Sequence, residues 1–295
     1  VWDNKPYPMY NEPFYSSIDM IATISKVTSE IVQNVSPDVW EEYIPHAVDT
    51  KVFRKLTSPE EKQIVENHRQ QILRDGKDKT IFFWNNRNAR RKQSGTLVFW
   101  FKEFLDRVGH DQATLVMHTD PDDPHGQPLP HLITILELVK GQVQLSTQKV
   151  SPEGLNLFYN AADCTINISD AEGFGLATLE SMAAETPIVV NMTGGLQDQV
   201  TDGEEWFGIG ITPSSRAVIG SQSVPYIYED RINKDDFINA LEKIHKMSKK
   251  DRAALGKKCR QNVEKRFNFK DFQKRWVDVM LEVHEKFGSW DTRKN

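Results

Sequence analysis

Glu172 and Glu180 enclose the sequence Gly-Phe-Gly-Leu-Ala-Thr-Leu, and two carboxylates around such a glycine turn are suited to binding a hydroxyl-rich anion. The apolar run Cys164–Ile168 just before them predicts a buried strand, and open α/β sheets bind ligands at the carboxyl ends of their strands. Gly173 and Gly175 lack side chains, so a ligand can approach the backbone there. The motif therefore predicts a binding site at a sheet edge.

A helix predicted from about Phe174 adds a charge preference to this site. The free N–H groups and the positive dipole end of a helix start favour a phosphate. Glu180 lies beside an inward-facing stripe that includes Leu176 and Leu179, so we expect a half-buried carboxylate that accepts two hydrogen bonds from a ribose diol. Glu172 would reach hydroxyl groups further along the ligand. Two solvated surface glutamates are the alternative.

A basic segment, Asn85–Lys92, also follows an apolar strand pattern and precedes a predicted helix. We predict a diphosphate clamp in which Arg87 and Lys92 neutralise the two phosphates while Arg90 and Arg91 face solvent. The net charge of −5 and the lack of interleaved aromatic residues argue against a nucleic-acid site. A solvated basic loop is the other alternative.

Two adjacent glycines, Gly194 and Gly195, follow the apolar run Ile188–Asn191 and permit close approach to an anion or a sugar. A plain turn explains such a pair equally well when it stands alone. Elsewhere, the run Asp120–Asp123 with His118 and His125 suggests a metal site, but its prolines and loop position favour a solvated turn, and no Cys/His spacing fits zinc. We therefore expect no metal and no other cofactor.

The elements that must position these motifs alternate between strand and helix patterns, which predicts an α/β, doubly wound fold with a parallel sheet covered on both faces. The expected strands are Met20–Ile24, Thr80–Trp84, Thr114–His118, Gln142–Leu145, Cys164–Ile168, Ile188–Asn191 and Gly208–Ile211. The expected helices are Lys26–Val35, Glu60–Arg74, Thr96–Arg107, Leu129–Val139, Pro152–Ala161, Leu176–Glu185, Asp251–Phe267 and Phe269–Phe287. Residues 212–231 are expected to form a long loop.

The composition, with 38% hydrophobic and 27% charged residues in a chain of 295, is typical of a globular protein with one large or two ordinary domains. No apolar run approaches the roughly 20 residues of a membrane helix. Cys164 and Cys259 lie in apolar strand and helix patterns, so we expect reduced, structural thiols and a cytoplasmic setting. Because the first residue is Val1, we expect a fragment or a processed product.

Together these motifs resemble those of retaining glycosyltransferases of family 4, which belong to the glycosyl transferases group 1. Glu172–Glu180 is similar to the family's Glu-x7-Glu motif, Arg87 and Lys92 to its Arg-x4-Lys pair, and Gly194–Gly195 to its Gly-Gly loop. The run from Ile44 to Phe53 resembles its interdomain motif. The departures from the family pattern are His46-Ala47 for Asn-Gly, Asn86 for the Gly before Arg87, and Gln93 for the Gly after Lys92.

The resemblance implies the GT-B fold, in which two Rossmann-like domains face each other. By this resemblance, residues 44–268 form the nucleotide-sugar domain, residues 1–43 are the end of a mostly missing acceptor domain, and residues 269–295 carry a helix that crosses back to it. It also implies roles for the site. Arg87, Lys92 and Glu172 would be catalytic, and the donor-binding residues would be Glu180, Gly173, Phe174, Gly175, Leu176, Val150, Gly194 and Gly195. Val150 would edge the base.

The implied reaction moves a sugar from a nucleoside-diphosphate sugar to an acceptor hydroxyl with retention, without a metal or cofactor. The acceptor, whether glycan, lipid or protein, stays open, as does contact with a membrane surface; nucleic acid is not expected. The rival readings are a non-catalytic nucleotide- or glycan-binding subunit, a sugar-nucleotide epimerase of the same fold, and a glycosidase using both carboxylates. With its acceptor domain truncated, this chain alone could be only a binder.

Overall fold

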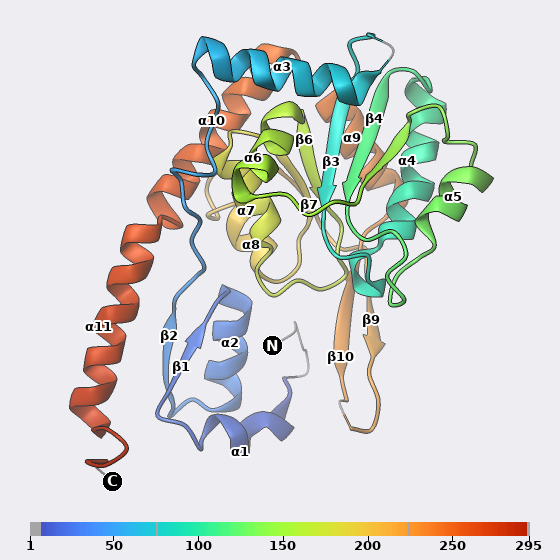
Figure 1. The fold of residues 1–295 in the computed structure, drawn as a ribbon. Coiled ribbons are helices and arrows are strands. Elements are labelled where there is room, and N and C mark those ends of the chain that lie inside the picture. The colour runs from blue at the N-terminus through green and yellow to red at the C-terminus, as the bar shows by residue number, and fades with distance from the viewer. Residues whose placement is uncertain (1–6, 75, 224, 294–295) are drawn as a thin grey trace.

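The computed structural model describes residues 7–74, 76–223 and 225–293, and a six-stranded sheet forms its centre (Figure 1). The strands are β3 (Thr80–Asn85), β4 (Ala113–His118), β5 (Val143–Ser146), β6 (Cys164–Asn167), β7 (Ile188–Asn191) and β8 (Ile209–Ile211). They are all parallel and lie in the order β5-β4-β3-β6-β7-β8. Nearly every residue of β3, β4, β6 and β7 is buried, because helices cover both faces of the sheet.

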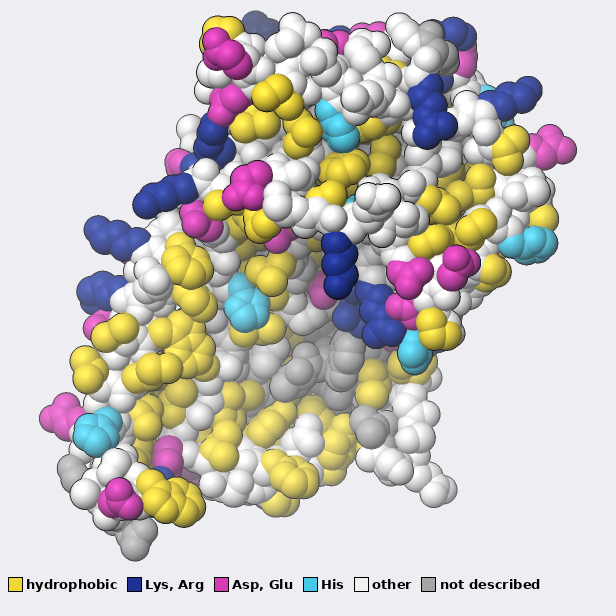
Figure 2. Space-filling view, in the orientation of Figure 1, with side chains coloured by type: hydrophobic (Ala, Val, Ile, Leu, Met, Phe, Trp, Pro, Cys, Tyr) yellow, Lys and Arg dark blue, Asp and Glu magenta, His cyan; other side chains and the backbone are white. Residues whose placement is uncertain are grey.

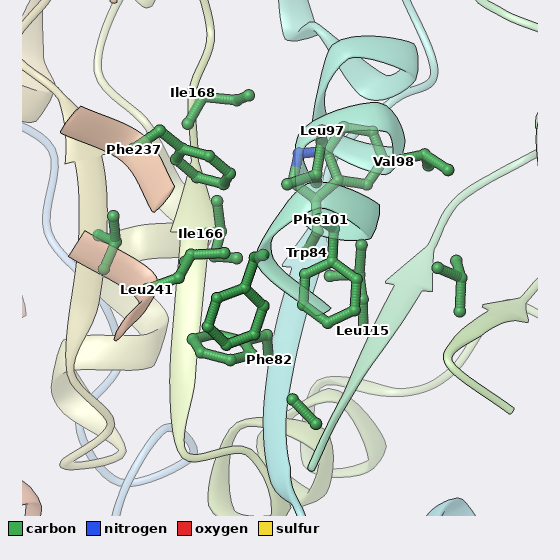
Figure 3. Packing of buried hydrophobic residues seen from close by; sticks show 14 of the residues in the cluster. Phe82, Trp84, Leu97, Val98, Phe101, Leu115, Ile166, Ile168, Phe237 and Leu241 are labelled. Carbon is green, nitrogen blue, oxygen red and sulfur yellow. The ribbon is translucent and has the colours of Figure 1, made fainter. Parts of the chain in front are cut away.

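Successive side chains of β3 point to opposite faces and pack into two separate cores. Phe82 and Trp84 belong to one core, and Figure 3 shows them beside Leu97, Phe101 and Phe237. The alternate strand residues Ile81 and Phe83 belong to the other core. The helices of the first layer are α4 (Ser94–Val108), α5 (Leu129–Ile135) and α9 (Lys234–Lys246). The helices of the second are α3 (Pro59–Leu73), α6 (Pro152–Ala161), α7 (Leu176–Ala183), α8 (Gly195–Val200) and α10 (Lys249–Arg266).

The point where the strand order reverses lies between β3 and β6. The chain runs outward in one direction through β3, β4 and β5 and in the other direction through β6, β7 and β8. Loops that follow the two central strands diverge, and open α/β sheets bind their ligands in the crevice left there. This topology places the segment after Asn85 and the segment after Asn167 side by side at the switch point.

A smaller part of the chain lies apart from this sheet (Figure 1). It contains a 3-10 turn (Met9–Asn11), α1 (Glu12–Tyr15), β1 (Met20–Thr23), α2 (Lys26–Val35) and β2 (Trp40–Tyr43), and β1 pairs with β2 in a two-stranded parallel sheet. The last helix, α11 (Phe269–Phe287), runs from the end of α10 back toward this sheet. There Arg275 pairs with Glu42 at 2.5 Å, and the ammonium of Lys286 lies 4.1 Å from the ring centroid of Trp40.

The doubly wound α/β prediction is confirmed, and the differences are local. Residues 212–231 are not one long loop, because β9 (Ser215–Ile219) and β10 (Ile227–Arg231) form an antiparallel hairpin within them. Serine, glycine and proline in this segment are typical of loops, so the sequence does not indicate these strands. The two buried residues of β10, Glu229 and Asp230, are both acids. The strand β2 and the helix α9 were not among the expected elements, and α5 ends at Ile135 rather than at Val139.

Candidate active site

Lys92 and Glu172 meet at the switch point and form an ion pair. Each side chain is only 9% exposed, so the pair is largely removed from water. Burial lowers the pKa of the Lys92 ammonium below its usual value, and the neighbouring Glu172 carboxylate partly opposes this shift. The structure therefore joins the two predicted motifs through one buried pair of opposite charges.

Arg91 reinforces the same loop contact, contrary to the expectation that it faces solvent. Its guanidinium donates to the backbone oxygen of Ala171 at 2.8 Å and lies 3.7 Å from Glu172. In the opposite direction, the backbone N–H of Asp170 donates to the backbone oxygen of Arg91 at 2.8 Å. The side chain of Arg91 is 33% exposed, because the loop after β6 covers most of it.

Arg90 reaches away from the crevice to the hairpin. Its guanidinium is 59% exposed, yet both terminal nitrogens donate to Glu229, at 3.0 and 2.5 Å. The Glu229 side chain is only 2% exposed. The prediction of a solvent-facing Arg90 is thus incomplete. Its side chain ties the loop of residues 86–92, called the clamp loop from here on, to β10. Figure 2 shows Lys and Arg side chains gathered where Figure 1 places the carboxyl ends of the central strands.

Arg87 lies in the same loop as Lys92 but makes different contacts. It donates to the Asp123 carboxylate at 2.6 and 3.2 Å and to Nδ1 of His125 at 2.9 Å. These bonds from Arg87 hold the pKa of Asp123 well below its usual range. The turn around Asp123 is largely exposed, as predicted, but the Asp123 side chain itself is 10% exposed and holds Arg87. Sequence reasoning missed this role of Asp123.

Gln93 adopts a backbone conformation that usually requires glycine. Its φ of 56° and ψ of 35° lie in the left-handed region. The side-chain amide compensates for this strain, because it donates to Asp170 and accepts a hydrogen bond from the Thr96 hydroxyl. Asp170 is buried, and burial raises its pKa to about 6.

The start of α7 faces this crevice without a side-chain cap. Gly175 precedes it at a φ of 90°, where an added Cβ would lie 2.6 Å from Leu196. Because the first N–H groups of a helix have no partner within it, those of residues 176–178 can donate to a ligand, whereas the Leu179 N–H donates to the Gly175 backbone oxygen. Phe174 is buried, but Leu176 is 48% exposed, so the prediction that Leu176 faces inward is wrong.

The glycine pair after β7 packs against the Glu172 segment rather than standing alone. A Cβ on Gly194 would lie 1.6 Å from the backbone oxygen of Glu172, and one on Gly195 would lie 2.7 Å from the Cα of Phe174. The N–H of Gly195 also donates to the backbone oxygen of Gly173 at 3.2 Å. The structure therefore brings the second and third predicted motifs into direct backbone contact.

Glu180 lies further along α7 and is half-buried, as predicted. The hydroxyl of Tyr159 donates to its Oε2 at 2.7 Å. Burial raises the pKa of Glu180 to about 7, and the Tyr159 hydrogen bond lowers it in part. Tyr159 was not identified from the sequence, where an aromatic residue in a packing helix carries no separate signal. Val150 is 39% exposed and lies just before Ser151, the N-cap of α6.

The described part of the chain offers neither a metal-binding cluster nor a helix that could cross a membrane. Within residues 7–74, 76–223 and 225–293, no three or more His, Cys, Asp or Glu side chains are grouped so that they could hold a metal ion. Over the same part of the chain, none of the helices has both the length and the apolar character needed to cross a membrane. Cys164 and Cys259 are both buried free thiols.

Comparison with known proteins shows what this chain is similar to. A family model described as "Glycosyl transferases group 1" matches residues 64–262. The D-inositol 3-phosphate glycosyltransferase of Acidothermus cellulolyticus is 51% identical over 53 residues, which are 18% of this chain and 12% of that protein. A trehalose synthase of Thermococcus litoralis is 24% identical over 184 residues, 61% of this chain and 39% of that protein. The matched regions thus span less than half of these relatives.

The fold is also that of solved glycosyltransferase structures of the GT-B type. The sucrose-phosphate synthase of Thermosynechococcus elongatus matches with a TM-score of 0.72 and 22% identity, over 94% of this chain and 61% of that one. Anabaena HepE in complex with UDP-glucose matches with a TM-score of 0.71 and 14% identity, over 94% of this chain and 69% of that one. At these identities the likeness concerns the fold.

Proposed function

This chain belongs to the glycosyl transferases group 1, and we propose that it binds a nucleoside-diphosphate sugar at the switch point and transfers the sugar to an acceptor hydroxyl with retention. One observation carries the proposal. The buried Lys92–Glu172 pair lies at the uncapped start of α7, with Glu180 further along the same helix. A cation, free N–H groups and two carboxylates are the groups that a diphosphate joined to two sugars requires.

Lys92 would stabilise the negative charge that develops on the departing diphosphate. A preorganised cation in a site that excludes water acts more strongly than it would in solution, because little solvent screens it. Binding of the diphosphate would draw Lys92 away from Glu172. The Glu172 carboxylate could then accept hydrogen bonds from the hydroxyls of the transferred sugar, while Glu180 accepts those of the ribose.

Arg87 would join the diphosphate by exchanging partners. In the structure its side chain is 60% exposed and is bonded to the Asp123 carboxylate, whose side chain is 10% exposed. Because solvent reaches the guanidinium, a dianionic diphosphate can compete with this single carboxylate for it. Arg87 therefore remains a candidate for the second phosphate contact, with Asp123 as its resting partner.

We further propose residues 44–268 as the donor domain, residues 1–43 as part of an acceptor domain, and residues 269–295 as the segment that joins them. The separate β1–β2 sheet and its contacts with α11 through Arg275 and Lys286 support this division. Uridine diphosphate sugars are the first donors to test, because the similar Anabaena structure holds UDP-glucose.

A thermal-shift and calorimetry panel of UDP-, GDP- and ADP-glucose tests donor binding by this chain. We expect one nucleotide sugar to stabilise the protein and Lys92→Ala to abolish that stabilisation. Lys102→Ala is the matched control, because Lys102 forms a surface pair with Asp106 on α4. No stabilisation of the unmutated chain by any of the three donors would contradict the proposal. Binding without sugar release would favour the non-catalytic binder.

A further inference from the structure

The hydroxyl group of Tyr159 links Glu180 to the strand that carries the clamp loop. It donates to Oε2 of Glu180 at 2.7 Å and accepts a hydrogen bond from Nδ2 of Asn85, the last residue of β3, at 3.0 Å. The Tyr159 side chain is fully buried. Phe83 packs edge-on against its ring with 5.4 Å between centroids, and the Tyr159 backbone oxygen accepts from the Thr186 hydroxyl at 2.7 Å. The phenol is therefore held in place from several sides.

The direction of these hydrogen bonds leaves one carboxylate oxygen open. A phenol has a single hydrogen, and the Asn85 amide already donates to its oxygen, so that hydrogen points to Glu180. Oε2 of Glu180 is thereby occupied. Among the residues that the structure describes, none donates a hydrogen bond to Oε1 of the half-buried Glu180.

We propose that Tyr159 is a positioning residue, which fixes the Glu180 carboxylate so that its free oxygen meets the ribose diol of the bound nucleotide. This inference rests on the proposed function and adds a residue that acts through Glu180 rather than on the ligand. A fixed carboxylate binds a diol with less loss of side-chain entropy than a mobile one does. The same link ties the ribose contact to the loop that begins after Asn85.

Tyr159 also favours the ionised form of Glu180. Burial raises the pKa of Glu180, and the hydrogen bond from Tyr159 opposes that shift. Tyr159 on α6 is the titratable group that contacts Glu180, and no ion pair to Glu180 is present in the described part of the chain. Loss of the hydroxyl should therefore raise the pKa of Glu180 further. As the pH is lowered, the carboxylate would then be protonated, and ribose binding lost, at a higher pH than in the unmutated chain.

The test compares UDP with 2′-deoxy-UDP by calorimetry from pH 6 to 8.5, with GDP and ADP and their deoxy forms in parallel. The unmutated chain should bind the ribonucleotide more tightly. Tyr159→Phe keeps the ring and should weaken UDP binding about tenfold at pH 7, the scale of a hydrogen bond to a charged group, with little effect on 2′-deoxy-UDP. The pH below which UDP binding weakens should be higher in Tyr159→Phe than in the unmutated chain. Adding Glu180→Gln to Tyr159→Phe should cause little further loss of UDP affinity.

Tyr43→Phe is the matched control, because the Tyr43 hydroxyl also donates to a buried carboxylate, that of Asp198, at 3.4 Å, and makes no hydrogen bond to Glu180. It should leave the ribose preference unchanged. Asn85→Ala gives a second route to the same readout if Tyr159→Phe folds poorly, because it removes the amide that donates to the phenol oxygen, so that the hydroxyl is held less firmly and the ribose preference should weaken.

Three results would overturn the inference. An unchanged ribose preference and pH profile in Tyr159→Phe would exclude positioning while leaving donor binding intact. If Tyr159→Phe loses the same affinity for ribonucleotides and deoxyribonucleotides at every pH, the role of Tyr159 is merely structural. If the unmutated chain binds none of UDP, GDP and ADP, the proposed function fails, and this inference fails with it.

Discussion

Lys92 and Glu172 form an ion pair in which both side chains are only 9% exposed, and they come from loops that follow adjacent strands of the sheet. The pair joins the clamp loop to the segment that leads into α7. When one member of a buried pair is removed, the other charge stays desolvated without its partner. Each member of this pair therefore compensates the buried charge of the other, and the same two charges are the ones proposed to meet the ligand.

These two contributions of the pair can be separated by mutation. Lys92→Met keeps the apolar stem and should lower the free energy of unfolding by about 3 kcal/mol, the lower end for a broken buried pair, because Arg91 lies 3.7 Å from Glu172. Lys92→Met combined with Glu172→Gln should regain most of that stability, yet neither variant should bind the donor. Urea unfolding and calorimetry measure the two effects. A double variant as unstable as the single one would show that the ion pair is not the cause.

Arg87 should matter more for donor affinity than for stability. Its side chain is 60% exposed, and Asp123 keeps the hydrogen bond from the His125 N–H, so Arg87→Ala should lower the free energy of unfolding by only about 1 kcal/mol. Loss of a charge-assisted bond to phosphate should weaken donor binding about tenfold or more. Arg107→Ala is the control, because Arg107 is also an exposed arginine that pairs with an aspartate, Asp235, on the surface. Equal donor affinity in Arg87→Ala and Arg107→Ala would remove Arg87 from the site.

The parallel sheet could be predicted from the sequence because the evidence for its strands is local. Runs such as Thr80–Asn85 and Ile188–Asn191 are buried on both faces and are nearly all apolar. The partners of the arginines could not be predicted in this way. Asp123 lies 36 residues from Arg87, and Glu229 lies 139 residues from Arg90. No spacing rule connects such pairs, since only the folded chain brings them together.

Buried acids explain the other differences between prediction and structure. Glu229 and Asp230 make the strand β10 look polar, although both are nearly fully buried against arginine side chains. Gln93 is a related case, because the left-handed backbone expected for glycine is kept by a residue whose side chain bonds to Asp170. In both cases a distant polar partner offsets a local preference, and a single sequence does not show that partner.

Gly194 should tolerate no side chain, because its neighbour is backbone. Gly194→Ala would place a Cβ 1.6 Å from the backbone oxygen of Glu172 and should displace that segment. Gly203→Ala is the matched control, since Gly203 also has a positive φ, of 102°, but has nothing within 4 Å of an added Cβ. We expect a loss of about 1–2 kcal/mol for Gly203→Ala from backbone strain alone and a clearly larger loss for Gly194→Ala, with donor binding lost as well. Equal losses in chemical unfolding would contradict the contact.

Asp170 should make stability fall as the pH rises from about 4 to 6. Burial raises the pKa of this carboxyl to about 6 in the folded chain, above its ordinary value in the unfolded chain. Between those values the folded state binds more protons than the unfolded state does, so the free energy of unfolding decreases with increasing pH. Carboxyls with lowered pKa values, such as that of Asp123, contribute the opposite slope. The contribution of Asp170 must therefore be measured as a difference between variants.

Asp170→Asn supplies that difference, because the amide keeps an oxygen for the hydrogen bond from Gln93 but cannot ionise. The variant should gain stability relative to the unmutated chain as the pH rises from 4 to 7, by on the order of 2 kcal/mol. Asp122→Asn, at an exposed position, should follow the unmutated chain throughout. Urea unfolding at each pH gives the three curves. If the curves for Asp170→Asn and the unmutated chain run parallel, Asp170 ionises equally in both states, and its buried carboxyl does not oppose folding at neutral pH.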